Sequence, residues 1–206
     1  MTSPNRKPTK VDGRRQRSER TKQLIVEAYI ALVREKPQIP TATQIAERAG
    51  YSVRSVFERF PDLHVLRVAA VDHATAQRTA QGVLREIEGD RQTRINTSVR
   101  IRAQGCESWL PMWRVLNANQ GESEELKERI RRVRQLVMMR FEATFKPELS
   151  TLSEVERRRT TIAFEALSDF ESWGRMREFY GLSFDEACGV WASATDRLLP
   201  PTPADS

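Results

Sequence analysis

A short segment near the N-terminus, TATQIAERAGYSVRSVFERF at residues 41–60, carries hydroxyl and guanidinium side chains at spacings that suit DNA recognition. A helix that presents such groups in its first two turns can enter the major groove, with its N-terminal end toward bases or phosphates. The residues of this segment that we expect to point outward are Thr43, Ser52, Val53, Arg54, Ser55, Phe57 and Arg59.

The same segment holds the residues that a tight turn between two helices needs. Ala46 is small enough for the two backbones to approach, and Gly50 tolerates the positive φ of the turn. Val56 is placed to point back into the first helix. The other inward positions are expected to hold Ile45, Ala49, Tyr51 and Phe60. An ordinary helical hairpin has the same spacing, so spacing alone leaves both interpretations open.

Local signals predict three short helices around this turn. Apolar residues recur at helical spacing over residues 21–36, and prolines end that helix. Thr41 and Gln44 form a capping box for the second helix, and Ser52 is placed to cap the third, at 53–60. The buried face of the first helix is expected to contain Ile25, Ala28, Tyr29, Leu32 and Val33.

The net charge of the chain is concentrated at its N-terminal end. Residues 1–60 hold 13 Lys and Arg against 6 Asp and Glu, a net charge of +7, whereas residues 61–206 hold 21 against 22, a net charge of −1. Such a basic region suits a polyanion, nucleic acid first and an anionic membrane surface second, and a solubilising tail is the competing interpretation. Residues 1–20 have no apolar periodicity and are expected to form a mobile basic arm.

The rest of the chain is also predicted to be helical, so we expect an all-α fold. Sustained strand alternation, hairpin turns and an apolar run long enough for a membrane span are all missing from the sequence. Helices are expected near 62–88, 91–104, 106–118, 123–147, 153–173 and 183–199, with breaks at glycines or prolines. The expected organisation is an arm at 1–20, a three-helix DNA-binding domain at 21–63, a larger helical domain at 64–200 and a frayed tail at 201–206.

Residues for catalysis or metal binding do not form a recognisable pattern. His64 and His73 are nine residues apart and would lie on opposite faces of one helix. Glycine-rich phosphate loops, zinc-binding motifs and nucleophile elbows are absent from the sequence. We expect Cys106 and Cys188 to behave as buried small apolar residues in a protein of the reducing cytoplasm. We therefore expect no enzyme activity, no metal and no cofactor.

Residues 25–66 resemble the N-terminal part of TetR-family transcriptional regulators. The matching features, in order, are the helix IVEAYIALVREK, a Thr cap, IAERAG, a Ser-led recognition helix with an aromatic-x-x-Phe pattern, and a Pro-led start of the fourth helix. Residues 173–183 are similar to the connection between the family's last two helices. The resemblance implies a homodimer that binds a palindromic DNA operator with half-sites about 34–36 Å apart.

The resemblance also implies roles for individual residues. Thr41 and Thr43 would touch a phosphate or a base edge, and Ser52, Arg54 and Ser55 would supply the polar contacts of the recognition helix, with Arg54 able to read guanine. Two departures weaken the phosphate contacts, because Phe57 stands where the family often has tyrosine and Leu63 where it often has lysine. The side chains that could replace these contacts electrostatically are Arg59, Arg14, Arg15 and Arg17.

In the larger domain the resemblance implies an effector pocket and a dimer interface. The pocket candidates are Trp109, Trp113, Met138 and Phe141, although plain core packing is the competing interpretation of such a cluster. The last two helices would form a four-helix dimer interface, and burial inside one subunit competes there too. The apolar residues available for that interface are Phe164, Leu167, Phe184, Val190, Trp191 and Leu198.

Together these features predict a cytoplasmic, sequence-specific DNA-binding regulator, a repressor that a small, largely apolar effector releases from DNA. One alternative is a DNA-binding organiser or adaptor of the same fold that a protein partner controls. An enclosed cavity of a few hundred Å³ among the central helices would distinguish the two. A helical enzyme is the alternative from a different class, and membrane binding would need a basic amphipathic helix that the arm lacks.

Overall fold

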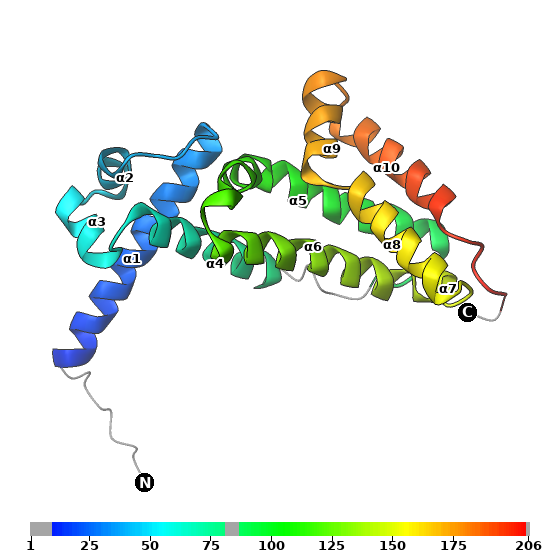
Figure 1. Ribbon diagram of the computed structural model, residues 1–206, viewed down its shortest axis with the longest axis horizontal. Helices are drawn as coiled ribbons and strands as arrows, with labels where there is room; N and C mark the ends of the chain where they lie inside the picture. The colour runs from blue at the N-terminus through cyan, green and yellow to red at the C-terminus, as the bar shows by residue number, and fades with distance from the viewer. Residues whose placement is uncertain (1–9, 81–86, 205–206) are drawn as a thin grey trace, which may run out of the picture. The chain divides into compact units, whose positions relative to one another are not determined.

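A computed structural model describes residues 10–80 and 87–204 of the chain, and every regular element in these residues is a helix (Figure 1). The chain divides into two compact units, Met1–Gln77 and Arg78–Ser206. The predicted all-α fold is therefore confirmed.

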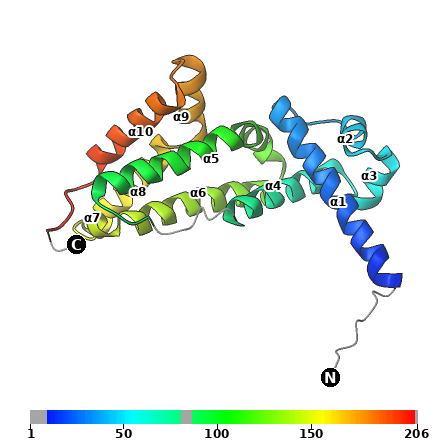
Figure 2. The same cartoon turned by 180° about the vertical axis from the view of Figure 1, so that it is seen from behind.

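The first unit contains α1 (Lys10–Glu35), α2 (Ala42–Ala49), α3 (Val53–Arg59) and most of α4 (Leu63–Ala80). The predicted buried face of α1 is confirmed at Ile25, Tyr29 and Val33, which have no exposed surface. In both views α2 and α3 lie beside α1, and α1 contacts each of them (Figures 1 and 2).

The expected mobile arm is wrong for residues 10–20, because α1 begins at Lys10. Helical side-chain bonds continue through this region: Arg17 Nε donates to the Gly13 carbonyl at 3.0 Å, and the Thr21 hydroxyl donates to the Arg17 carbonyl at 2.9 Å. Arg, Gln and Glu are good helix formers, so a polar and basic segment can extend a helix whose later turns are packed. Residues 1–9 lie outside the described residues.

The boundary between the two units falls after Gln77, inside α4, and not near residue 63 as expected. Leu66 and Ala70 of α4 are fully buried, and Arg67 lies close to the phenol of Tyr29 on α1. Burial raises the pKa of Tyr29 to about 12, and the positive charge of Arg67 opposes that rise. The first turns of α4 therefore complete the N-terminal core.

The second unit begins with one long helix, α5 (Arg91–Asn119), where two helices were expected. The expected break at Gly105 is wrong, because Gly105 lies inside the helix and is buried. Glycine weakens a helix by only about 1 kcal/mol relative to alanine. The buried side chains of Cys106, Trp109 and Leu110 hold the helix through this point and through Pro111.

Shorter helices follow α5, and the views show α6 running alongside it (Figures 1 and 2). The predicted helix at 153–173 is interrupted, because Asp169 caps a new helix by accepting a 2.6 Å hydrogen bond from the Ser172 amide. The elements after α5 are η1 (Gln120–Glu122), α6 (Glu124–Thr144), α7 (Lys146–Leu149), α8 (Glu154–Leu167), α9 (Phe170–Gly174), the π-helical turn η2 (Arg175–Phe179) and α10 (Phe184–Leu198).

Aromatic rings in contact form much of the core of the second unit. The ring centroids of Phe141 and Phe164 are 4.0 Å apart, and those of Trp173 and Trp191 are 5.0 Å apart. Phe164 and Trp191 are 5% and 4% exposed, so their expected place in a dimer interface is wrong. Each packs inside its own subunit because a ring from another helix already covers it.

The C-terminal tail is held against the second unit, although it was expected to fray. Arg91 pairs with Asp196 and donates to the carbonyls of Leu199 and Pro200. The Thr202 hydroxyl donates to the buried carboxylate of Glu148 at 2.6 Å. These bonds secure the tail as far as Thr202.

Candidate functional site

The turn between α2 and α3 has the geometry that the sequence predicted. Thr41 caps α2: its hydroxyl accepts from the Gln44 amide at 3.3 Å, and the Gln44 side chain accepts from the Thr41 amide at 2.9 Å. Gly50 ends α2 with φ of 74°, a value that favours glycine. The following Tyr51 amide donates to the Ala46 carbonyl at 2.9 Å. The capping box and the glycine turn are both confirmed.

The start of α3 is fixed by its own serines. The Ser52 hydroxyl accepts from the Ser55 amide at 3.1 Å, and the two hydroxyl oxygens are 3.0 Å apart. Val56 is 1% exposed and packs the inner face of α3 against the core, and Phe60 is buried at the C-terminal end of α3. The hydroxyl-bearing first turn of α3 therefore faces away from the core of the unit.

The outer face of α3 carries one long cation between two apolar side chains. The Arg54 side chain is 87% exposed, and its Nε lies 3.1 Å from a carboxylate oxygen of Glu58 one turn later. Val53 and Phe57 are also exposed, at 36% and 44%. Arg54, Val53 and Phe57 thus lie where the sequence predicted, with Thr43 exposed on α2.

Arg59 differs from the other predicted contacts. Its side chain is only 29% exposed, and its Nε is buried. A guanidinium nitrogen lies 3.8 Å from Glu58, which also pairs with Arg54. Arg59 therefore presents less of its charge to solvent than the expected outward position implied.

A bidentate ion pair links α1 and α2. Arg48 on α2 donates to both carboxylate oxygens of Glu35 on α1, at 2.8 and 2.6 Å. The hydrogen bonds from Arg48 lower the pKa of Glu35 below its ordinary value. A weaker contact of 3.4 Å joins the hydroxyls of Thr21 and Tyr51, so α1 also holds the turn in place.

The first turns of α1 carry exposed arginines on a helix where an arm was expected. Arg15 and Arg17 are exposed. The Arg14 backbone is helical, but its side chain lies outside the described residues. These guanidiniums therefore have a fixed spacing along α1, which a mobile arm would not give them.

The four predicted pocket residues lie in the second unit, and three of them belong to two ring clusters. Trp113 stacks on Phe170 with centroids 4.6 Å apart, and Trp109 contacts the same ring at 6.5 Å. Phe141 belongs to the other cluster, with Phe164, and Met138 is half-buried on α6. Trp109, Trp113 and Phe141 are each at most 3% exposed.

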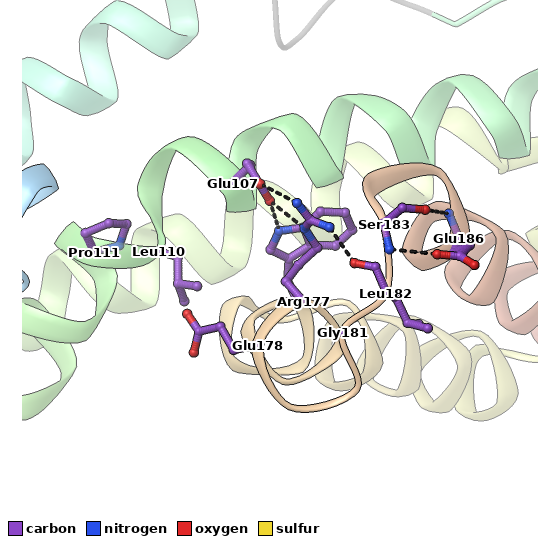
Figure 3. Close-up of a pocket in the computed structure, with 10 residues that line it drawn as sticks. Glu107, Leu110, Pro111, Arg177, Glu178, Gly181, Leu182, Ser183 and Glu186 are labelled. Atoms are coloured by element: carbon purple, nitrogen blue, oxygen red, sulfur yellow. Dashed lines mark hydrogen bonds and ion pairs between the residues drawn. The ribbon is translucent and has the colours of Figure 1, made fainter.

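A pocket of about 560 Å³ lies instead beside η2 and the start of α10, and none of the four predicted residues lines it (Figure 3). Three carboxylates face it, from Glu107, Glu178 and Glu186. Glu107 on α5 joins the two sides of the pocket. Its carboxylate accepts a hydrogen bond from Trp173 Nε1 on α9 at 2.5 Å and from Arg177 on η2 at 3.1 Å.

Each of these carboxylates already has a partner inside the protein. Arg177 binds Glu107 and also donates to the Leu182 carbonyl, as Figure 3 shows. Glu178 accepts two bonds of 2.9 Å from Arg114, which lower its pKa, and Glu186 belongs to the capping box of α10. The pocket is therefore lined by a network that holds η2 against α5.

Sequence reasoning missed this network because Glu107 and Arg177 are 70 residues apart and follow no periodic pattern. The two thiols agree with their predicted role, since Cys106 and Cys188 are buried and burial raises the pKa of Cys188. Among residues 10–80 and 87–204, no group of three or more metal-binding side chains comes together.

None of the helices in the described part of the chain is both long and apolar enough to cross a membrane.

Comparison with known proteins adds to this geometry. No protein-family model matches the sequence, and no curated protein matches it. Solved structures do match. A TetR-family transcriptional regulator from Streptomyces coelicolor is 15% identical with a TM-score of 0.70, over 87% of this chain and 80% of that one. The chain has the TetR fold.

Two further structures agree with the first. A Rhodococcus sp. protein assigned to the TetR family is 19% identical with a TM-score of 0.68, over 87% of this chain and 98% of that one. A Pseudomonas aeruginosa PAO1 protein assigned as a transcriptional regulator is 18% identical with a TM-score of 0.67, over 87% and 90%. In this chain α2 and α3 are joined by the short turn at Gly50 and Tyr51.

Proposed function

We propose that the chain is a sequence-specific DNA-binding transcriptional regulator that reads the major groove with α3. The observation that carries the proposal is the outer face of α3, where an 87% exposed Arg54 lies between two exposed apolar side chains and beyond the hydroxyls of the first turn. This exposure leaves the guanidinium of Arg54 accessible to a base edge in the groove. The similarity to structures of transcriptional regulators supports the same function.

The proposed contacts follow from the chemistry of these side chains. Arg54 donates two hydrogen bonds to O6 and N7 of a guanine, which requires it to leave Glu58. Val53 and Phe57 contact thymine methyl groups or sugar carbons. Ser52 and Ser55 have hydroxyl protons to donate to phosphates, and Arg15 and Arg17 on α1 add an electrostatic contribution.

We also propose that the regulator is a homodimer whose interface lies on α8 and α10. With Phe164 and Trp191 inside the subunit, the apolar side chains left on these helices include Val155, Ile162 and Val190, which are 59%, 48% and 49% exposed. Val155 and Ile162 are seven residues apart on α8 and share one face. Two-fold symmetry would place two recognition helices on half-sites about 34–36 Å apart.

Regulation by an effector completes the proposal. A small molecule bound in the second unit would favour a dimer whose recognition helices no longer match successive major grooves, and this would release a repressor from its operator. We propose that the effector lies near Trp109, Trp113 and Phe141, which belong to the two ring clusters, and near Met138, which is half-buried on α6.

Selection of DNA from a random library by the purified protein, followed by sequencing, tests this function. A palindromic site is expected, and Arg54→Ala should weaken binding to it by about 1–3 kcal/mol and relax one base position. Arg34→Ala, which removes an exposed arginine from the other end of α1, is the matched control and should leave the site unchanged. Failure to enrich any sequence would refute the proposed function.

A further inference from the structure

Arg140 on α6 keeps its charged group inside the protein. Its Nε, Nη1 and Nη2 atoms are all buried, and no described residue forms a hydrogen bond with any of them. The residue as a whole is half-buried, so its remaining exposure lies on the aliphatic stem and backbone. Arginines usually have the opposite arrangement, with a buried stem and a charged group in water.

The pKa of Arg140 also indicates a buried guanidinium without a charged partner among the described residues. The pKa of Arg140 is lowered by burial alone, and no carboxylate among the described residues offsets that effect. Arg94 provides the contrast within the same unit, because its buried guanidinium binds the carboxylate of Glu148. Among the described residues, Arg94 therefore has an anionic partner and Arg140 has none.

A buried arginine does not avoid the cost of its charge by losing its proton, because the guanidinium stays protonated in proteins. A buried charge without a counter-ion destabilises the folded state. A ligand that supplies the missing negative charge would offset this cost. A carboxylate or a phosphate fits the planar guanidinium best, because either can accept two parallel hydrogen bonds.

The neighbours of Arg140 on the same face of its own helix are two apolar residues and one threonine. Leu136 and Val137 lie one turn before it and Thr144 one turn after it on the same face. The next residue, Phe141, is buried in the ring cluster of the second unit. A ligand whose anion reaches Arg140 would therefore place the rest of its surface against hydrocarbon.

We propose that Arg140 binds the anionic headgroup, a carboxylate or a phosphate, of a small ligand that otherwise has an apolar body. The inference rests on the proposed function, since this ligand would be the effector. It replaces a largely apolar effector by an amphiphilic anion.

Isothermal titration calorimetry with decanoate, decyl phosphate and 1-decanol tests the proposal on the full chain. At least one of the two anions should bind about 10- to 100-fold more tightly than the alcohol, and Arg140→Met should remove that preference. Arg132→Met, an exposed arginine on the same helix, should keep it. The comparison of the two anions identifies the headgroup. Equal binding of anion and alcohol, or an unchanged preference in Arg140→Met, would overturn the proposal.

Thermal unfolding without ligand provides a second readout. If the Arg140 head has no partner in the free protein, Arg140→Met should raise Tm, because it removes an uncompensated buried charge and keeps the stem's volume. A lower Tm for this variant would show that the guanidinium already has a partner, and the proposal would fail.

The DNA selection experiment separates this inference from the proposed function. Without ligand, Arg140→Met should select the same DNA site as the original chain with similar affinity. If neither protein selects DNA, the regulator function is wrong. If both select DNA but neither decanoate nor decyl phosphate binds, only the anion site is wrong.

Discussion

Glu148→Leu is expected to destabilise the second unit strongly. The Glu148 side chain has no exposed surface, and its partner Arg94 has a side chain that is 12% exposed. Removal of the carboxylate leaves the Arg94 guanidinium buried without an anion. It also removes the acceptor of the Thr202 hydroxyl, which lies 2.6 Å away.

The expected loss follows from these contacts. Breaking a buried ion pair by removing one partner costs about 3–5 kcal/mol. At roughly 2–4 °C for each kcal/mol in a chain of this size, Tm should fall by roughly 6–20 °C. Thr202→Val, which removes only the hydroxyl bond, should cost about 1 kcal/mol.

Urea unfolding followed by circular dichroism measures this effect, with Arg94→Leu/Glu148→Leu as the decisive variant. Because the double variant leaves no unpaired charge, it should recover most of the lost stability. Asp185→Leu is the control, since it breaks an exposed ion pair with Arg100 and should cost at most about 1 kcal/mol. The reasoning is refuted if Glu148→Leu costs no more than this control, or if the double variant is less stable than the single one.

Three further predictions concern the rest of the chain. Gly50→Val should destabilise the first unit by about 1–3 kcal/mol, because φ at this turn is 74° and a β-branched residue strains there; an unchanged urea midpoint would contradict this. Because the pKa of Glu35 is lowered in the folded state, its ion pair should stabilise the fold at pH values above the ordinary pKa of glutamate, and this contribution should be lost as the pH falls through the lowered pKa. Arg48→Gln should raise the Glu35 pKa in an NMR titration. Ile162→Asp should shift a dimer toward monomer in analytical ultracentrifugation, and a dimer of unchanged strength would place the interface elsewhere.

The first unit could be predicted from sequence because its decisive signals are local. The capping box at Thr41, the glycine at position 50 and the periodicity of α1 each act over a few residues, and each is present in the structure. The exposed position of Arg54 followed from helical spacing within α3, where Val56 points inward. Arg59 was predicted less well, because its partial burial depends on packing that helical spacing does not specify.

The second unit was harder because distant contacts decide its details. Gly105 is a helix-breaking signal that the burial of neighbouring side chains overrides. Phe164 and Trp191 were interface candidates because they are apolar residues on the last two helices, but rings from Phe141 and Trp173 cover them. Whether an apolar side chain faces its own subunit or a second one depends on which helices meet, and one sequence does not contain that information.

The anchored tail has a mechanical consequence. A force that pulls on the C-terminal tail acts first on a few hydrogen bonds. Thr202 donates to Glu148, and the carbonyls of Leu199 and Pro200 accept from Arg91. Arg91 and Glu148 lie on α5 and α7, so force on the tail is passed directly to two other helices. Unfolding from this end therefore has to break these bonds to α5 and α7 before the tail is free.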